Sequence, residues 1–111
     1  MLKLRRVLMD KFDKLREKIL PVLLPYGVKR VAVFGSVVRG EDTPSSDVDI
    51  LVALKPPHER SPLGLFKWIA LEEELGEILG CKVDLVTEDG VSPYIRPYID
   101  SEKVILYEEK G

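Results

Sequence analysis

Hydrophobic residues recur at three- and four-residue intervals in two stretches of the chain. In the first twenty residues they are Leu4, Leu8, Phe12, Leu15 and Ile19. In the second stretch they are Leu65, Ile69, Leu71, Leu75, Ile78 and Leu79. This spacing is typical of the apolar face of a helix, so two long amphipathic helices are predicted, the second closing near Gly80. Pro21 and Pro25 are expected to kink or end the first helix, and the acidic run 72–74 is expected to point outward from the second.

Four short apolar runs have the length and composition of β-strands, namely 29–34, 48–54, 81–87 and 103–107. The first contains four consecutive apolar residues, which is typical of a buried strand. Short helical turns are expected at Val37–Arg39 and around Pro93–Ile99. The segment 55–62 holds three prolines and is expected to be an exposed, non-helical connection. The resulting order predicts an α+β or α/β domain, a mixed sheet covered by two long helices.

Length and charge narrow the function classes. A chain of 111 residues is expected to form one domain, residues 1–111, without a separate substrate domain. Lysine and arginine total 17 against 19 acids, and no continuous basic block occurs, so nucleic acid is not expected as a direct partner. The single cysteine, Cys81, fits a reducing cytoplasm. No apolar run has the length of a signal peptide or membrane span, so a cytoplasmic protein without a membrane partner is expected.

The most specific pattern in the chain is a group of acids that follows a glycine-serine step. The predicted first strand leads into Gly35-Ser36, and Asp47 and Asp49 come where the second strand begins. Alternate side chains of a strand share a face, so these two acids are expected to project together and hold one or two divalent cations. Asp84 interrupts a second apolar strand run. Three carboxylates facing a turn that approaches phosphate closely predict a site for a metal-bound nucleoside triphosphate, and hence nucleotidyl transfer.

Each of these residues also has a structural interpretation. Gly35 and Ser36 are expected to cradle the phosphates, but a lone Gly-Ser step is also an ordinary turn. Asp47 and Asp49 bridge the metals in the functional interpretation and lie at a solvated edge or helix cap in the other. Asp84 either completes one metal's coordination and acts as general base, or faces solvent.

Three further side chains leave alternatives open. Arg39, one turn after the predicted phosphate loop, can neutralise a triphosphate or pin that loop through an ion pair. Phe66 and Trp68 are expected to pack the second helix rather than to stack on a nucleotide base. None of these alternatives is decided by spacing.

The residues Gly35-Ser36, Arg39-Gly40, Ser46-Asp47-Val48-Asp49 and Asp84 together resemble the minimal nucleotidyltransferases of the DNA polymerase β superfamily, which pair with HEPN-domain proteins. The resemblance runs from about Val31 through Tyr107. It implies a polymerase β-like fold, magnesium at the two-aspartate motif, triphosphate at the Gly-Ser turn and a triad completed by Asp84. Val37-Val38 departs from many relatives, which carry Arg-Ala or similar residues there.

The resemblance further implies an antitoxin of the MntA type. Such a protein uses ATP and Mg²⁺, with two ions expected, to transfer AMP to a tyrosine hydroxyl of a HEPN ribonuclease toxin. Two alternatives remain: neutralisation by stoichiometric binding alone, and modification of a small hydroxylated molecule. A homodimer or a larger hetero-oligomer is compatible with the aliphatic residues of the first helix.

Overall fold

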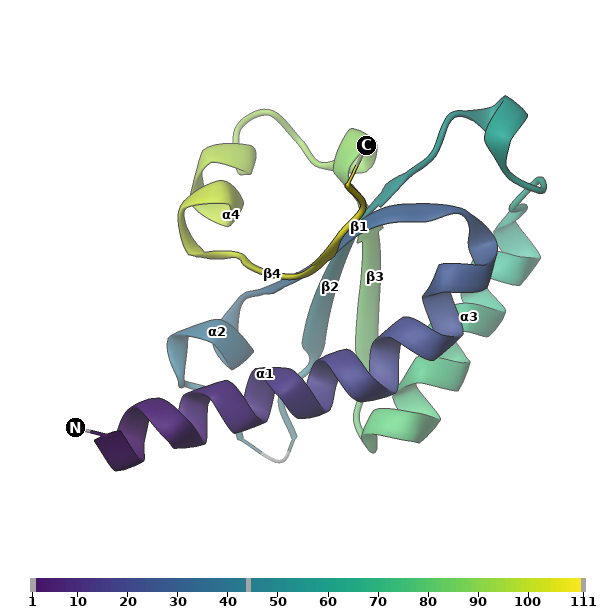
Figure 1. Cartoon of the computed structure of the whole chain (residues 1–111). Helices are drawn as coiled ribbons and strands as arrows, with labels where there is room; N and C mark the ends of the chain where they lie inside the picture. The colour runs from purple at the N-terminus through teal and green to yellow at the C-terminus, as the bar shows by residue number, and fades with distance from the viewer. Residues whose placement is uncertain (1, 44, 111) are drawn as a thin grey trace.

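The structure, a computed structural model, describes residues 2–43 and 45–110, with side chains from residue 11 onward. The helices are α1 (Leu2–Leu23), α2 (Ser36–Arg39), α3 (Leu65–Leu79) and α4 (Arg96–Glu102). The strands are β1 (Val28–Phe34), β2 (Val48–Leu54), β3 (Val83–Thr87) and β4 (Val104–Glu108), which together form the sheet of Figure 1. None of the described helices combines the length and apolar character needed to cross a membrane.

The four strands form one mixed sheet in the order β3-β2-β1-β4. β1 pairs antiparallel with both β2 and β4, whereas β2 and β3 are parallel. A parallel pair requires a crossover connection, and α3 provides it. The end of β1 therefore meets the beginnings of β2 and β3 at one end of the sheet.

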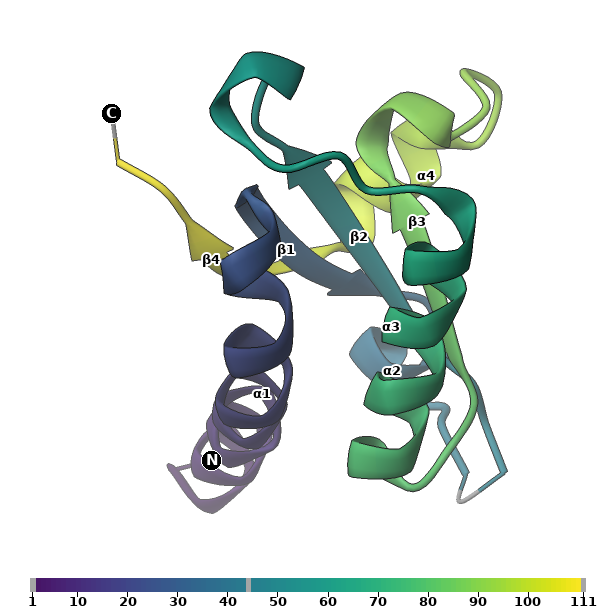
Figure 2. The same ribbon diagram turned by 90° about the vertical axis from the view of Figure 1, so that its right-hand side faces the viewer.

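Helices cover the sheet on both faces. α1 and α3 lie on one face, and α4 lies on the other (Figure 2). The main core lies under α1 and α3, and its fully buried side chains include Ile19, Leu23, Val31, Ile50, Leu71 and Leu75. A smaller cluster of Ala32, Leu51 and Ile99 lies under α4. The predicted α+β fold with two long helices on a mixed sheet is confirmed, and α4 is an additional short cover on the second face.

The first helix extends further than its prolines suggest. Pro21 lies inside α1, in the last turn, and the helix ends at Leu23. Pro21 has no N–H to donate to the preceding turn, but the buried side chains of Ile19 and Leu23 hold the last turn of the helix on the sheet. Pro25 then falls in a 3₁₀ turn, Leu24–Tyr26, that leads into β1.

The second helix has the predicted bounds, Leu65–Leu79, but two expectations about its side chains are wrong. Phe66 does not pack the helix, because 87% of its surface is exposed. Glu72 does not point outward: its Oε2 accepts a hydrogen bond of 2.9 Å from the backbone N–H of Leu85 in β3. Trp68 packs against the core as expected.

The remaining boundaries differ from the prediction by a few residues. The proline-rich connection contains a 3₁₀ turn, Pro57–Glu59, although it was expected to be wholly non-helical. β3 begins at Val83 rather than at Cys81. The last helix is α4, Arg96–Glu102, and lies three residues later than the predicted turn. These shifts fall where short turns connect elements, and there spacing gives little signal.

Candidate active site

Two predicted carboxylates, those of Asp49 and Asp84, lie where β2 and β3 begin. The strands run parallel, and the Cα atoms of these two residues are direct register partners. Each aspartate is the second residue of its strand and is flanked on both sides by residues of the main core. Since alternate side chains point to opposite faces, both carboxylates project from the face on which α4 lies.

Asp47 comes one residue before β2 and is exposed. It nevertheless lies within electrostatic reach of Asp49, whose carboxyl pKa is raised above its ordinary value. Burial is the largest cause, followed by the negative charges of Asp84 and Asp47, and the positive charge of Arg39 opposes them. The structure thus brings the three predicted aspartates together at one end of the sheet.

Gly35 is required at the turn that follows β1. Its backbone has φ 80° and ψ −152°, a combination that is strained for any residue with a side chain. A Cβ atom on this residue would lie 2.3 Å from Oδ2 of Asp49, inside van der Waals contact. The absence of a side chain at Gly35 therefore leaves room for the Asp49 carboxylate beside the turn.

Ser36 begins α2 directly after this turn. The carbonyl of Gly35 accepts hydrogen bonds from the backbone N–H groups of Val38 (3.0 Å) and Arg39 (3.2 Å), which closes the short helix. The carbonyl of Ser36 accepts from the N–H of Glu41 at 3.0 Å, so the turn is fixed at its far end as well. Ser36 is thereby held next to Gly35 at the same end of the sheet as the aspartates.

Arg39 is held by two acids. Its Nε donates to Glu41 and its Nη1 donates to Oε2 of Glu102, both at 2.8 Å. These hydrogen bonds, that to Glu41 first, raise the pKa of the guanidinium. These ion pairs agree with one of the two interpretations of the sequence, in which Arg39 pins the loop through an ion pair. The Arg39 side chain is still 46% exposed, which leaves part of the guanidinium accessible to a ligand. A phosphate-binding role for Arg39 remains a prediction.

Glu102 is a site residue that sequence reasoning did not identify. Its Oε1 accepts a hydrogen bond of 3.0 Å from the backbone N–H of Gly35, while its other oxygen binds Arg39. The hydrogen bond to Arg39 is the main cause that lowers the pKa of the Glu102 carboxyl. Glu102 lies beyond the predicted turn at Pro93–Ile99, and no spacing along the chain connects it to Gly35. Only the pairing of β1 with β4 brings it there.

The strand that carries Asp84 is tied to α3 at the residue after the aspartate. The indole Nε1 of Trp68 donates to the backbone carbonyl of Leu85 at 3.1 Å, and the carboxylate of Glu72 accepts from the backbone N–H of Leu85. β3 is an edge strand, so these groups have no strand partner on that side. Two side chains one helical turn apart on α3 therefore fix the backbone next to Asp84.

A groove of about 740 Å³ opens beside Asp47. Its walls come from α1, the loop before β2 and the end of α3, and include Lys11, Lys14, Lys18, Thr43, Ser46 and Leu79. Lys11 is bound to Asp42 at 2.7 Å. Lys14 and Lys18 also line this groove and give its wall positive charge beside Asp47, whereas Asp49 and Asp84 do not line it.

The aspartates form an open arrangement rather than a closed metal centre. Among residues 2–43 and 45–110, no three His, Cys, Asp or Glu side chains converge as a complete metal-binding group. Carboxylate oxygens are the ligands that Mg²⁺ prefers, and Mg²⁺ commonly completes its shell with water and substrate phosphates. The charges of Asp84 and Asp47 add to burial, the largest cause, in raising the pKa of Asp49, so negative charge gathers at this point. The donor set is therefore compatible with Mg²⁺ shared between the protein and a phosphate-bearing substrate.

A mixed sheet with three aspartates and a glycine-serine turn at one end defines a nucleotidyltransferase. Residues 12–106 match the nucleotidyltransferase domain family, which is most of the chain, so the protein belongs to this family. The family confirms the predicted polymerase β-like fold and the predicted class of enzyme.

Similar proteins indicate which kind of nucleotidyltransferase this chain resembles. The chain is 44% identical over 81 residues to protein adenylyltransferase MntA of Thermococcus cleftensis, covering 73% of this chain and 77% of the relative. It is 39% identical over 92 residues to a candidate protein adenylyltransferase of Methanocaldococcus jannaschii, covering 83% and 94%. A solved structure of a tri-AMPylated Shewanella oneidensis HEPN toxin in complex with MNT antitoxin has a TM-score of 0.67 at 20% identity, covering 87% of this chain and 72% of that one. The last likeness shows the fold alone, and the first two confirm the resemblance to MntA-type proteins.

Proposed function

We propose that this protein is the antitoxin of a two-protein system and transfers AMP from ATP to a tyrosine hydroxyl of a HEPN ribonuclease toxin. The observation that carries the proposal is the register pairing of Asp49 with Asp84 beside Gly35. This pairing places two carboxylates next to the Gly35-Ser36 turn, which we propose as the triphosphate-binding segment. The names of the adenylyltransferase relatives support AMP as the transferred group.

In the proposed reaction the phenol oxygen of the acceptor attacks the α-phosphorus of ATP. A bond forms between that oxygen and the phosphorus, the bond from the α-phosphorus to the bridging oxygen of the β-phosphate breaks, and pyrophosphate leaves. Asp84, which is exposed, accepts the phenol proton in this scheme. Gly35, Ser36 and Arg39 hold the triphosphate in line for the displacement.

Asp47, Asp49 and Asp84 are the residues that would hold Mg²⁺, with two ions expected. When bound, the metal supplies neutralisation of the negative charge on the reacting phosphates. The proximity of the three carboxylates supports this assignment: burial is the main cause that raises the pKa of Asp49, and the negative charges of Asp84 and Asp47 raise it further, so a bound cation would relieve their repulsion. We propose the lysines that line the groove beside Asp47 as a further source of positive charge for the phosphates.

The HEPN partner is supported by the solved complex that shares this fold, in which an MNT antitoxin is bound to an AMPylated HEPN toxin. A tyrosine hydroxyl is proposed as the acceptor because the resemblance to MntA-type antitoxins implies it.

The test is the intact mass of a co-expressed HEPN-domain protein after incubation with this chain, ATP and Mg²⁺. The matched control is the Asp47→Asn/Asp49→Asn double variant, which keeps the side-chain volumes and removes two charges. A mass gain of one or more adenylyl units with the unaltered chain only, mapped to a tyrosine, is the expected result. An unchanged gain with the double variant would refute the proposed site.

Two other outcomes would redirect the assignment. If no adenylyl group appears but the double variant still neutralises the toxin in a stable complex, the antitoxin acts by binding alone. If the isolated chain adenylylates a small hydroxylated molecule and leaves the HEPN protein unmodified, the acceptor class is different. Omission of Mg²⁺ with a chelator tests the metal requirement in the same assay.

A further inference from the structure

The carboxylate of Glu102 occupies a place where a strand would normally supply a backbone carbonyl. The ladder between β1 and β4 ends with Val33 opposite Val104. Antiparallel strands run in opposite directions, so continuing this ladder by two residues moves forward along β1 and backward along the other strand. Gly35 would then face Glu102. The chain before β4 is already in α4, however, and the N–H of Gly35 donates to the side chain of Glu102 instead.

The carboxylate of Glu102 carries a negative charge, which a backbone carbonyl in the same place would lack. The second oxygen of Glu102 binds Nη1 of Arg39 at 2.8 Å. One side chain thus connects the residue before Ser36 with the arginine at the end of α2. Both ends of the segment proposed to bind triphosphate, Gly35 and Arg39, depend on the position of Glu102.

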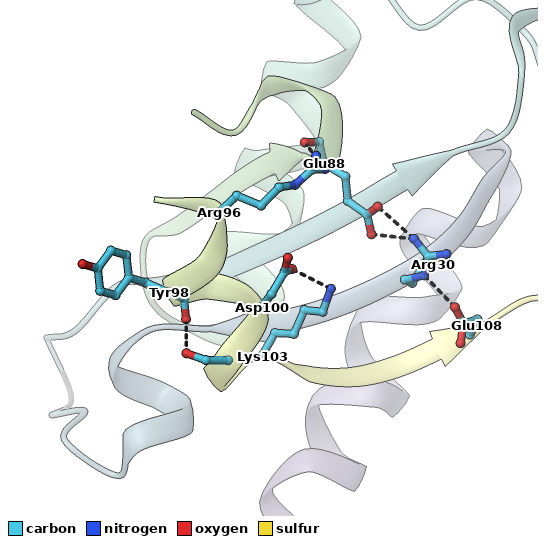
Figure 3. Close-up of polar contacts among 8 residues, drawn as sticks. Arg30, Glu88, Arg96, Tyr98, Asp100, Lys103 and Glu108 are labelled. Carbon is cyan, nitrogen blue, oxygen red and sulfur yellow. Dashed lines mark hydrogen bonds and ion pairs between the residues drawn. The ribbon is translucent and has the colours of Figure 1, made fainter. Parts of the chain in front are cut away.

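The helix that carries Glu102 is itself fixed on the sheet. Figure 3 shows Arg96, at the start of α4, reaching the segment after β3, where it donates to the carbonyl of Glu88 at 2.9 Å. Ile99 in the middle of the helix is buried against Ala32 and Leu51. Anchored at its first turn and at its centre, α4 presents its last residue to the end of β1.

We infer that Glu102 is a positioning residue for the transfer reaction: it sets the conformation of the Gly35-Ser36 turn and the direction of Arg39 for the triphosphate of ATP. The inference rests on the proposed function, because it assumes that ATP binds at this turn. Glu102 does not touch the reacting atoms in this scheme and acts through Gly35 and Arg39. Its role is therefore separable from those of the three aspartates.

Three variants test the inference. Glu102→Ala removes both hydrogen bonds. Glu102→Gln keeps an oxygen that accepts from the N–H of Gly35 and loses the charge that pairs with Arg39. Asp100→Asn is the matched control, because Asp100 is the other acid within α4 and pairs with Lys103 at 2.9 Å (Figure 3).

The first measurement needs no acceptor protein. The affinity of each variant for a non-hydrolysable ATP analogue with Mg²⁺ is measured by calorimetry, and the thermal midpoint of each variant is measured as well. Glu102→Ala is expected to bind about tenfold or more weakly, Glu102→Gln about three- to tenfold more weakly, and Asp100→Asn as the unaltered chain. In AMP transfer, Glu102→Ala is expected to lose about 100-fold in kcat/KM, with most of the loss in KM for ATP when the turn is only misplaced.

Each result decides the inference. Unchanged binding by a folded Glu102→Ala variant overturns it. Tighter binding also overturns it, because Glu102 would then compete with phosphate for Arg39 instead of positioning it. If Glu102→Ala does not fold, Glu102→Gln decides: weaker binding at an unchanged thermal midpoint supports the inference, and unchanged binding leaves Glu102 with a folding role alone. Because analogue binding is measured without a HEPN protein, failure of the proposed acceptor does not affect this test.

Discussion

Asp49 on β2 and Asp84 on β3 are register partners, although the whole of α3 separates them in the sequence. The parallel crossover through α3 starts both strands at the same end of the sheet. β1 runs the other way, so Phe34 pairs with Asp49 and the next residue, Gly35, reaches the same point. Strand direction alone therefore brings the glycine turn and the carboxylates together.

Replacement of Gly35 tests that convergence. Gly35→Ala places a Cβ atom 2.3 Å from Oδ2 of Asp49 at a φ of 80°. Strain at such a backbone position costs about 1–3 kcal/mol, and the carboxylate has to move. We expect a lower free energy of unfolding in denaturant titration and a loss of AMP transfer of about 100-fold.

Gly64→Ala is the control for the glycine substitution. Gly64 precedes α3, its φ is −78°, and a Cβ there meets no atom within 4 Å. This variant is expected to fold and to transfer AMP as the unaltered chain does. Equal activity of the two alanine variants would show that the Gly35 turn tolerates a side chain.

Asp49→Asn is expected to stabilise the metal-free protein while it abolishes transfer. The folded-state pKa of Asp49 lies above its ordinary value of 3.8, so the ionised carboxylate destabilises the fold at all pH values above the folded pKa. This penalty fades as the pH falls through the folded pKa and is absent below 3.8. Thermal midpoints with a chelator should therefore be higher for the variant at pH 7, with a difference that disappears in acid.

Added Mg²⁺ provides the complementary measurement. A ligand that binds only the folded state raises its stability. The unaltered chain should gain in thermal midpoint when Mg²⁺ and an ATP analogue are added, and Asp49→Asn should gain less. A variant that is less stable than the unaltered chain at pH 7 without metal would contradict the electrostatic argument.

The contacts between α3 and β3 predict that a substitution on α3 changes the stability of β3 and, through it, the activity that depends on Asp84. Glu72→Ala leaves the N–H of Leu85 without its acceptor. We expect a loss of about 1–2 kcal/mol in unfolding free energy, with faster amide hydrogen exchange at Leu85. AMP transfer should fall by a smaller factor than in a variant that lacks Asp84 itself.

Glu73→Ala is the control for this effect, because the neighbouring Glu73 is exposed on the same helix. Its unfolding free energy should stay within about 0.5 kcal/mol of that of the unaltered chain. If both variants behaved alike, the hydrogen bond from Leu85 would have no measurable role in holding β3.

The charge of the groove beside Asp47 can be tested with lysine variants. Lys14→Ala/Lys18→Ala removes two positive charges from its wall. Weaker binding of an ATP analogue is expected, by about tenfold at low salt and less at high salt, because the attraction is screened. Lys67→Ala is the control: Lys67 lies over the ring of Tyr26 at 4.9 Å and does not line the groove. Equal affinities for all three proteins would place the phosphates elsewhere.

The sequence predicts the regular elements of this fold well, and the reason is periodicity. The bounds of β2 and α3 agree with the structure, since an unbroken apolar run and a sustained helical spacing are strong local signals. The convergence of Asp47, Asp49 and Asp84 is also predictable, because each lies at or near a strand start. Their metal-binding and catalytic roles remain predictions.

Side-chain directions that depend on tertiary contacts are not predictable in this way. Glu72 belongs to an acidic run that suggests a solvated face, and only the free edge of β3 explains why it turns inward. Glu102 has no local signal at all, because its partner Gly35 is brought to it by the position of β4. Pro21 remains helical because tertiary packing outweighs its local preference.

The hydrogen bond between Gly35 and Glu102 joins residues 67 positions apart. Bringing two residues so far apart in the chain together costs more conformational entropy than forming a local turn does. During synthesis, the ribosome will have delivered β1, β2 and β3 before Glu102 emerges. A nascent chain can therefore possess all three aspartates and still lack the hydrogen bond that fixes the Gly35 turn; under the proposed mechanism, transfer would begin only when the chain from α4 onward has docked.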